Sequence, residues 1–521
     1  MSQNKNIFND VASPGVKKSW FDMSNTHVTS FNFGEIIPVY VEPTLPGSVW
    51  KLSSEWLVKT AATLAPIMHR NQVYIHNFFV PYRILWENWV NFITETKVGG
   101  VLPAVPYITF DDGDGEGLNQ VTRLANYMGI PFVSTLQPGQ ADGSKAQAFW
   151  FAAYQKIWNE YYRDQNLQGE MDTELLDGDN STLWVDLMIL KQRNWMHDYF
   201  TSALPDTQKG DSVNIPMTFE DVKVKRDRDP AVSGATTNWN VTTPAGDGVI
   251  IENESTPLSA DLYADTSVLT GNASIIDLRT AEQLQKFRET MMTHGSRYNE
   301  FLKAIYGYAI KDDTVQRPVY LGGMRGDLIV SETLNTAGNA DLNLPQGNKS
   351  GNLNSYSNGG NSSYMCPEHG VIMSLMSVMP DSMYFQGIRK EFLKLDDPFS
   401  FGNPLMANIG EQPIARHELF AFQGGANTTF GYQMRYAEYK QTMNRLSADM
   451  TGNLLFWNMA RRFTAAPPLT DSFIRCDSAN DDLNRIFNVE DDSAQKLWVM
   501  VRTNANVLNP LPYFGTPMLG G

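Results

Sequence analysis

Residues 73–80 are the segment that most constrains the fold of this chain. They are VYIHNFFV, a short run of mostly β-branched and aromatic residues that Pro81 closes. This pattern is typical of a core strand. A second strand is predicted at residues 36–41, beside Pro38 and Pro43. Because proline cannot donate a ladder hydrogen bond, that strand is expected at a sheet edge or corner.

Apolar stripes with helical spacing are also present, but they are scattered along the chain. They fall in four segments: residues 85–93, 154–161, 277–305 and 454–460. In the third segment, Thr280 and Gln283 fit a capping box, Gly295 interrupts the stripe and Gly307 ends it. Helices that do not alternate regularly with strands argue against a doubly wound parallel sheet. We therefore predict a mainly β, antiparallel scaffold with long, partly helical loops.

Two segments have the composition of surface insertions. Residues 211–274 are rich in Thr, Gly, Asn and Asp and contain ten acidic residues against four basic ones. We expect this segment to project into solvent. Residues 335–363 are dominated by Asn, Gly and Ser, which favour turns and flexibility, so a flexible loop is predicted there. The core is then expected from residues 1–210 and 275–521.

The overall composition indicates a globular protein. Of 521 residues, 42% are hydrophobic and only 19% are charged, and the net charge is -16. An acidic chain is poorly suited to coat nucleic acid unaided, because such binding depends on Lys and Arg replacing counterions. Two cysteines, Cys366 and Cys476, allow at most one bridge and no multi-cysteine zinc site. With no apolar signal sequence in residues 1–10, folding in a reducing cytoplasm is expected.

The motifs of common catalytic sites are absent. The chain has no G-x-S-x-G elbow, no phosphate-binding loop and no dinucleotide-binding glycine pattern. The acidic run 111–117 does not fit the calcium-loop register, and it and residues 177–180 are more typical of solvated turns. No two histidines are spaced i, i+4, and His76 is expected to be a hydrogen-bonded core residue. We predict no catalytic residue, no cofactor and no metal site.

Two features keep other functions open. Paired carboxylates for glycoside hydrolysis leave no local spacing, and aromatic pairs such as Trp86 and Trp89 can stack on sugars. The alternative function is therefore a β-rich carbohydrate-binding protein or glycoside hydrolase. The basic pairs are candidates for nucleic-acid contact, although such pairs are more often solvated or in salt bridges. These candidates are Lys17, Lys18, Arg461 and Arg462.

Nine segments, in order along the chain, resemble one viral family. They are LAPIMHRNQVYIHNFFVPYRI (64–84), YQKIWNEYYRDQNL (154–167), DYFTSALPDTQK (198–209), DLRTAEQLQKF (277–287), RYNEFLKAIYG (297–307), QRPVYLGG (316–323), EHGVIMSLMSV (368–378), FGYQMRYAEYK (430–440) and LPYFGTP (511–517). Together they are similar to the major capsid protein of the Microviridae, bacteriophages with single-stranded DNA, and of its gokushovirus-like branch. The residues of the second segment that carry this resemblance are Trp158, Asn159, Glu160, Tyr161, Tyr162, Arg163 and Asp164.

The resemblance implies a structural, non-enzymatic protein. The expected fold is an eight-stranded antiparallel jelly roll with enlarged loops, one of the architectures of viral capsids. The expected assembly is a T=1 icosahedral shell around a circular single-stranded DNA genome. Residues 211–274 would form a protrusion at the three-fold axes and contact the host.

The resemblance also implies partners and a location. Identical subunits would meet at five-, three- and two-fold axes, and the packaged DNA would be accompanied by a small basic DNA-binding protein. An internal scaffolding protein would act during assembly, a minor DNA pilot protein would accompany the particle, and a host-cell surface receptor would be its target. The chain is expected in the virion, and in the host cytoplasm during assembly.

Overall fold

The structure is a computed structural model of the full chain. The residues that it describes are 16–97, 99–109, 124–130, 145–211, 213, 224–226, 240–242, 250–252, 262–264, 275–334, 349–395, 397–422, 427–488 and 494–514. The acidic run 111–117 lies outside the described residues, as does most of 211–274.

The larger antiparallel sheet has six strands. They are β1 (Ser19–Asp22), β2 (Asn25–Phe31), β4 (Val49–Thr60), β13 (Ile329–Leu334), β14 (Lys349–Met365) and β18 (Leu497–Asn509). The order is β1–β18–β4–β14–β13, and β2 also pairs with β18. Along β18 and β4, buried residues alternate with more exposed ones. One face of this sheet therefore packs into the core, while the other is open to solvent.

The smaller antiparallel sheet has four strands in the order β12–β5–β15–β3. They are β3 (Ile37–Thr44), β5 (Asn71–Pro81), β12 (Val319–Asp327) and β15 (Gly370–Pro380). Every residue of β15 is buried, and so is every residue of β5 except His76. The core strand predicted at residues 73–80 is confirmed. The strand predicted near Pro38 is also confirmed, and it lies at the sheet edge, as proline requires.

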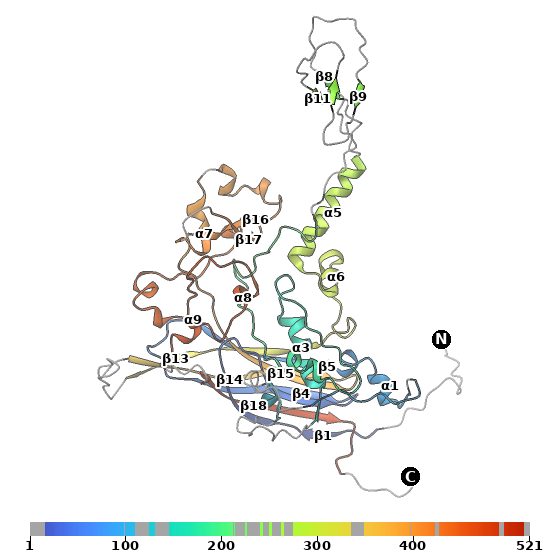
Figure 1. The fold of residues 1–521 in the computed structure, drawn as a ribbon. Coiled ribbons are helices and arrows are strands. Elements are labelled where there is room, and N and C mark those ends of the chain that lie inside the picture. The colour runs from blue at the N-terminus through green and yellow to red at the C-terminus, as the bar shows by residue number, and fades with distance from the viewer. Residues whose placement is uncertain are drawn as a thin grey trace, which may run out of the picture. The chain divides into compact units, whose positions relative to one another are not determined.

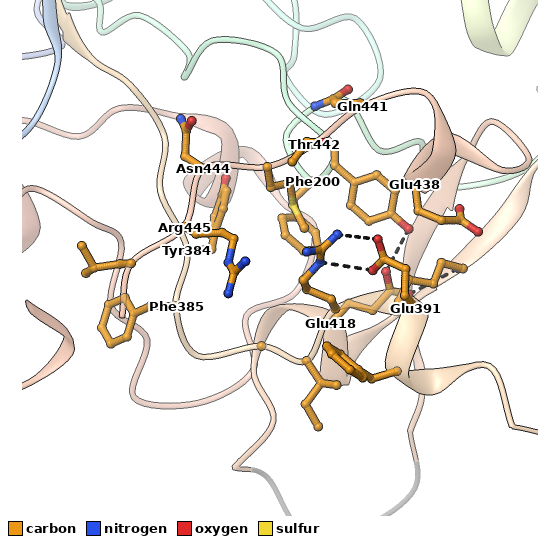
Figure 2. A pocket seen from close by; sticks show the side chains of 18 residues that line it. Phe200, Tyr384, Phe385, Glu391, Glu418, Glu438, Gln441, Thr442, Asn444 and Arg445 are labelled. Carbon is orange, nitrogen blue, oxygen red and sulfur yellow. Dashed lines mark hydrogen bonds and ion pairs between the residues drawn. The ribbon is translucent and has the colours of Figure 1, made fainter. Parts of the chain in front are cut away.

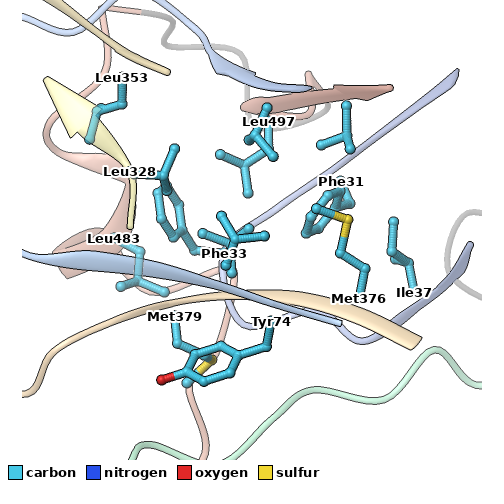
Figure 3. Close-up of a cluster of buried hydrophobic side chains, with 14 of the residues drawn as sticks. Phe31, Phe33, Ile37, Tyr74, Leu328, Leu353, Met376, Met379, Leu483 and Leu497 are labelled. Atoms are coloured by element: carbon cyan, nitrogen blue, oxygen red, sulfur yellow. The ribbon is translucent and has the colours of Figure 1, made fainter. Parts of the chain in front are cut away.

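The inner faces of the two sheets enclose the main hydrophobic core. Figure 3 shows part of it, with Phe31, Ile37, Met376 and Leu497 converging from strands or strand ends of both sheets. Trp50 and Phe79 join a second cluster toward one end of the strands. Because apolar side chains from both sheets leave water together, this shared core holds the sheets face to face.

Helix α3 (Phe149–Ile157) covers the other face of the smaller sheet. Seven of its nine residues are buried, and six of these join a cluster with Phe78 of β5 and Met373 of β15. The Tyr154 hydroxyl donates to the carbonyl oxygen of Ile36 at 2.8 Å, which ties the helix to the start of β3. In Figure 1, α3 lies against the smaller sheet, on the side away from β18.

Short elements fill the loops of the chain. The helices and turns are η2 (Tyr82–Ile84), α1 (Trp89–Ile93), η4 (Trp158–Tyr162), η5 (Ser181–Leu183), α4 (Trp184–Met188), α6 (Tyr298–Tyr306), η7 (Lys390–Leu393), η8 (Pro398–Phe401), η9 (Pro404–Met406), α7 (Arg416–Leu419), η10 (Ala437–Tyr439), η11 (Ala448–Thr451), η12 (Leu455–Trp457), α8 (Asp471–Ile474) and α9 (Asp481–Asn484). Two-stranded ladders are formed by β6 (Tyr107–Thr109) with β7 (Lys145–Gln147), and by β16 (Gln412–Ala415) with β17 (Thr429–Gln433).

The prediction of a flexible loop at residues 335–363 is wrong for residues 349–363. Residues 349–363 belong to β14, which pairs with β4 and β13 over its length. Asn, Ser and Gly have weak strand preferences, but in β14 their small side chains leave space for larger neighbouring side chains. Ser355 is buried and accepts a hydrogen bond from Trp56 Nε1 at 3.1 Å, so a small side chain makes room for a large ring. Residues 335–348 lie outside the described part of the chain.

The helical predictions are largely confirmed, with two corrections. Helices form where the stripes at 154–161 and 277–305 predict them, and the latter divides at Gly295 into α5 (Ile275–His294) and α6. Thr280 is no cap, because its hydroxyl donates to the Ile276 carbonyl oxygen inside the helix. Residues 454–460 form only the short turn η12, since Asn458 is extended and ends it.

The chain divides into two compact units. Unit 1 contains residues 1–207 and 293–521, and unit 2 contains residues 208–292. The described strands of unit 2 are β8 (Val224–Arg226), β9 (Asn240–Thr242), β10 (Ile250–Glu252) and β11 (Leu262–Ala264). They pair only with one another, as β8 with β11 and β9 with β10.

The fold class is mainly β with antiparallel sheets, as predicted. Cys366 and Cys476 are both buried and form no disulfide. Among the helices within the described ranges, none has both the length and the apolar character needed to cross a membrane.

We expect Ser355→Ala to lower the free energy of unfolding by about 1–2 kcal/mol, because it leaves the buried Trp56 N–H without an acceptor. The measurement is denaturant unfolding of the purified chain followed by tryptophan fluorescence. Ser363→Ala, at an exposed position of the same strand, is the control and should change stability by less than about 0.5 kcal/mol. Equal unfolding midpoints for the two variants would contradict this role of Ser355.

Candidate interaction surfaces

The family-motif residues 158–164 form a tightly connected joint after α3. Trp158 and Asn159 are buried, and the Asn159 side chain both donates to and accepts from the backbone of Met171 at 2.7 and 3.1 Å. The Asp164 carboxylate accepts the backbone N–H groups of Asn166 and Leu167. Trp158–Tyr162 is a π-helical turn, an uncommon conformation that needs such local support.

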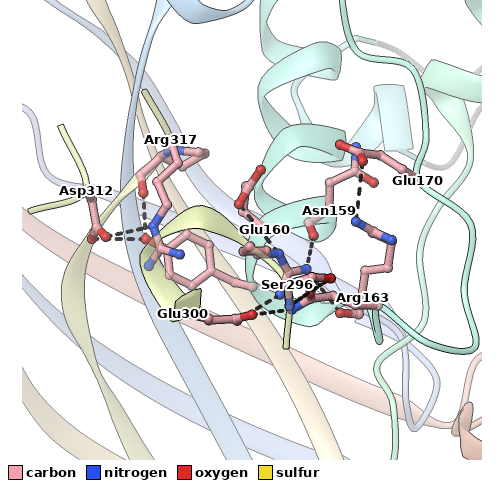
Figure 4. A network of polar contacts seen from close by, with 12 residues as sticks. Asn159, Glu160, Arg163, Glu170, Ser296, Glu300, Asp312 and Arg317 are labelled. Atoms are coloured by element: carbon pink, nitrogen blue, oxygen red, sulfur yellow. Dashed lines mark hydrogen bonds and ion pairs between the residues drawn. The ribbon is translucent and has the colours of Figure 1, made fainter. Parts of the chain in front are cut away.

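Arg297 is the centre of the polar network around this joint. Its guanidinium lies 3.7 Å from Glu160 and 3.4 Å from Glu300, and it also donates to the carbonyl oxygens of Asn159 and Arg163. Figure 4 shows these contacts with the neighbouring Arg163–Glu170 and Asp312–Arg317 pairs. The Arg297 guanidinium thus donates hydrogen bonds to carbonyl oxygens of the turn η4 and of the residue after it, and it connects this turn to Glu300 of α6.

The two tyrosines of the motif connect the joint to the smaller sheet. The Tyr161 hydroxyl donates to the Pro318 carbonyl oxygen at 2.6 Å, directly before β12. The Tyr162 hydroxyl lies 2.7 Å from Nδ1 of His76, so the predicted hydrogen bonding of His76 is confirmed, although its side chain is only partly buried. Burial, assisted by the positive charge of Arg193, lowers the pKa of His76 to about 4. The motif residues are therefore structural supports.

A second region exposes an unusual number of large apolar side chains. We call this set the apolar ledge: Ile388, Phe392, Leu395, Phe399, Phe401, Leu405, Ile409 and Tyr439. Phe392 is 73% exposed and Leu405 is 86% exposed. Single exposed apolar residues are ordinary, but many on neighbouring turns mark a surface that another molecule covers.

The local sequence explains why the ledge stays open. Asp397 and Asn403 each precede a proline and accept the backbone N–H two residues later, at 2.9 Å in both cases. Proline at the first position and an Asx side chain before it fix a short turn. The following Phe and Leu residues are therefore presented on rigid turns. This surface is not among the features predicted from the sequence, although the two Asx-Pro pairs are visible in the sequence.

One buried ion pair supports the ledge. Lys394 lies 2.7 Å from Glu438, both nearly buried, and the ammonium of Lys394 also lies over the Tyr439 ring. Although burial opposes ionisation, the Lys394 ammonium and the Gln412 amide hold the pKa of Glu438 below its usual value. Because a broken buried pair is costly, these contacts fix the ledge in place.

A cavity of about 360 Å³ beside the ledge contains three carboxylates, Glu391, Glu418 and Glu438. Figure 2 shows two of them with their partners: Arg389 pairs with Glu391, and Lys390 and Tyr199 contact Glu418. Burial raises the pKa of Glu418, and Lys390 opposes that rise. Each carboxylate has its own cation, which indicates structural pairing and not an acid and base around a sugar.

The structure places the four basic candidates differently. Lys17 and Lys18 are exposed just before β1, and Lys18 Nζ donates to the Gly47 carbonyl oxygen at 2.8 Å. Arg462 is exposed. Arg461 is only 4% exposed, donates to the Phe473 carbonyl oxygen and lies over the Phe473 ring. Arg461 thus supports the fold, and phosphate contact stays a prediction for the other three.

The other polar candidates also have structural partners. In residues 177–180, the Asp177 carboxylate accepts from Trp86 Nε1 at 2.7 Å, and Asp179 accepts from Ser181. Trp86 itself is buried against Phe149. Within the part of the chain that the structure describes, no group of three or more His, Cys, Asp or Glu residues is placed to hold a metal.

We expect Arg297→Gln to lower the stability of the purified chain by about 2 kcal/mol, because Glu160 and the carbonyl oxygens lose a shared, largely buried partner. Thermal or denaturant unfolding measures this change. The matched control is Arg389→Gln, which removes a more exposed pair and should cost less than about 1 kcal/mol. A destabilisation no larger than that of the control would show that the network is not central.

Comparisons with known proteins identify a capsid family. Residues 9–519 match the family described as capsid protein (F protein). The chain is similar to capsid protein VP1 of Chlamydia phage 1, with 28% identity over 99% of this chain and 98% of the relative. It is similarly related to capsid protein VP1 of Spiroplasma virus 4 (29%, 97% and 96%) and of Bdellovibrio phage phiMH2K (30%, 90% and 90%).

The matched part of this chain includes the sheets, the joint and the ledge. All three relatives belong to the Microviridae. The resemblance seen in the nine segments is thereby confirmed, and the carbohydrate-active alternative is set aside. This chain belongs to the capsid protein (F protein) family, so its function is that of a structural major capsid protein, a component of the virion and not an enzyme.

Proposed function

We propose that this capsid protein is a jelly-roll subunit of a T=1 icosahedral shell that encloses a circular single-stranded DNA genome. The observation that carries the assembly proposal is the apolar ledge on its fixed turns. A closed shell needs several distinct contacts between copies of one chain, around five-, three- and two-fold axes. Rigid, apolar anchors suit such contacts because little conformational freedom is lost when they are covered.

The strand order supports the jelly roll. Eight strands, in chain order β2, β3, β4, β5, β12, β14, β15 and β18, distribute over the two sheets. β2, β4, β14 and β18 belong to the larger sheet, and the other four to the smaller one. Two facing antiparallel sheets whose strands interleave in this way are the arrangement of a double Greek key. In this assignment β1 and β13 extend the larger sheet.

The remaining partners follow from the family. The genome would be accompanied by a small basic DNA-binding protein, which suits a capsid chain with a net charge of -16. A scaffolding protein would act inside the host cytoplasm during assembly, and a minor DNA pilot protein would join the particle. Residues 211–274 would form the three-fold protrusion that meets the host-cell receptor.

Replacing both Phe392 and Leu405 with serine should prevent closed shells from forming. Both side chains are exposed in the single chain, so the fold should survive, while removal of each anchor should weaken the interface between copies by about 2 kcal/mol. Electron microscopy and sedimentation of the purified protein measure assembly. The control is Val101→Ser, an exposed apolar position outside the ledge. Uniform shells from the double variant at normal yield would refute this role of the ledge.

Replacing residues 217–268 with a short flexible linker should leave unit 1 folded, because the strands described in that segment pair only with one another. The shortened protein should fail in host attachment or in contacts at the three-fold axes. Adsorption assays on the host and particle yield measure the two effects, and the unfolding midpoint of the chain serves as the control. Normal adsorption and infection by the shortened virus would contradict this assignment.

A further inference from the structure

The open face of the larger sheet is a second unpartnered surface, separate from the ledge. On β18 the residues Trp498, Met500 and Arg502 point away from the core, between buried Leu497, Val499, Val501 and Thr503. We call the solvent side of β1, β2, β4, β14 and β18 the open sheet face. The smaller sheet offers no such surface around β5 and β15, because α3 covers them.

The strand registers place aromatic and basic side chains next to each other on this face. Trp498 lies opposite Lys59 of β4, and in the next row Met500 lies between Leu57 and Val28. Tyr356 of β14 lies opposite Leu57, so it shares that row. Trp498 is 53% exposed and Tyr356 is 70% exposed. Because neighbouring strands are about 4.8 Å apart and β4 lies between β18 and β14, the two rings are separate stacking positions on one face, with Leu57 and Lys59 of β4 between them.

A second aromatic and basic pair lies at the other end of the face. Trp20 of β1 is opposite Leu508, and the ammonium of Lys51 lies 5.0 Å from the centre of the Trp20 ring. The exposed Lys17 and Lys18 directly precede β1. Rings and cations thus recur along the length of the face.

The charge of the open sheet face differs from that of the chain. Its strands direct three cationic side chains outward, Lys51, Lys59 and Arg502, and two carboxylates, Asp22 and Glu55. Asp22 accepts hydrogen bonds from Ser24, and Glu55 accepts from the Asn504 amide at 3.0 Å. In a chain with a net charge of -16, this face is slightly basic.

Polar side chains without charge occupy much of the remaining surface. Asn354, Asn358 and Ser363 of β14 and Asn506 of β18 alternate with buried residues and project to the same side. Amides and hydroxyls can hydrogen-bond to bases or sugars. The ledge, by contrast, presents mainly Phe, Leu and Ile side chains, as an interface between protein copies does.

We infer that the open sheet face binds single-stranded nucleic acid, with bases stacking on Trp498, Tyr356 and Trp20 and phosphates meeting Lys59, Arg502 and Lys51. Stacking platforms interleaved with cations are the usual means of binding unpaired strands without sequence preference. This inference rests on the proposed function, since an enclosed single-stranded genome is the ligand that such a face would receive.

The test uses the full-length chain, purified before assembly, and a short fluorescein-labelled oligothymidylate. Trp498→Ala combined with Tyr356→Ala should weaken binding about tenfold or more in fluorescence anisotropy titrations. Lys59→Gln combined with Arg502→Gln should reduce the slope of log affinity against log salt by about 0.7 for each phosphate that is no longer neutralised. The matched controls are Tyr308→Ala, at an exposed ring outside both the ledge and the open sheet face, and Lys303→Gln combined with Lys440→Gln. Both controls should leave both measurements unchanged.

Each outcome decides the question. No binding by the unaltered chain, or equal effects in test and control variants, would overturn the inference. If Trp498→Ala kept its affinity for the oligonucleotide but its assembled material had a lower sedimentation coefficient, the open sheet face would contact a second copy of the chain. The inference would then also be wrong. Electron microscopy keeps the proposed function separate, because closed shells that lack this binding would refute only the inference, whereas absent shells would refute the T=1 assembly.

Discussion

Burial of β5 and β15, the two central strands of the smaller sheet, on both faces is the constraint on which the rest of this structure depends. β5 and β15 face the larger sheet on one side and α3 on the other, so nearly all of their side chains are removed from water. A strand covered on both sides must be apolar at successive positions, and the chain between β5 and β12 must return over it as a long loop. The enlarged loops of this protein therefore have a structural cause: they supply the second cover.

The same arrangement explains the joint at residues 158–164. Because α3 packs across the smaller sheet, its end must be tied to the strands that it covers. Tyr161 reaches the start of β12, Tyr162 reaches His76 in β5, and Arg297 satisfies the carbonyl oxygens at the end of the turn. Family-specific residues are thus concentrated where the covering loop is attached, and not around a reaction site.

Local sequence predicts elements of this fold only where local preference and tertiary role agree. Residues 73–80 are strong β-formers at a site that requires them, and Gly295 separates two helices that the apolar stripe already indicated. The sequence does not predict β14, because its Asn, Ser and Gly residues favour turns. Only the pairing with β4 and the space that the Trp56 ring needs make this segment a strand.

The ledge is not predicted from the sequence for a related reason. Apolar residues such as Phe392 carry no periodic signal, and only their exposure in the folded chain distinguishes them from core residues. The basic pairs show the same limit: Arg461 and Arg462 are adjacent, yet only Arg461 turns inward, among aromatic rings.

Local charge, and not the net charge of the chain, decides what each surface can bind. At physiological ionic strength, exposed charges are screened over about 8 Å, so a carboxylate on a distant loop has little effect at a given sheet face. Ten of the acidic residues fall within residues 211–274, outside the strands of the two large sheets. Others are neutralised individually, as Glu418 and Glu438 are by Lys390 and Lys394 below the ledge. An acidic chain can therefore keep one apolar surface and one slightly basic surface on a single scaffold. The alternation of side chains along β18, which sends one row into the core and the other into solvent, is sufficient to build the second of these surfaces.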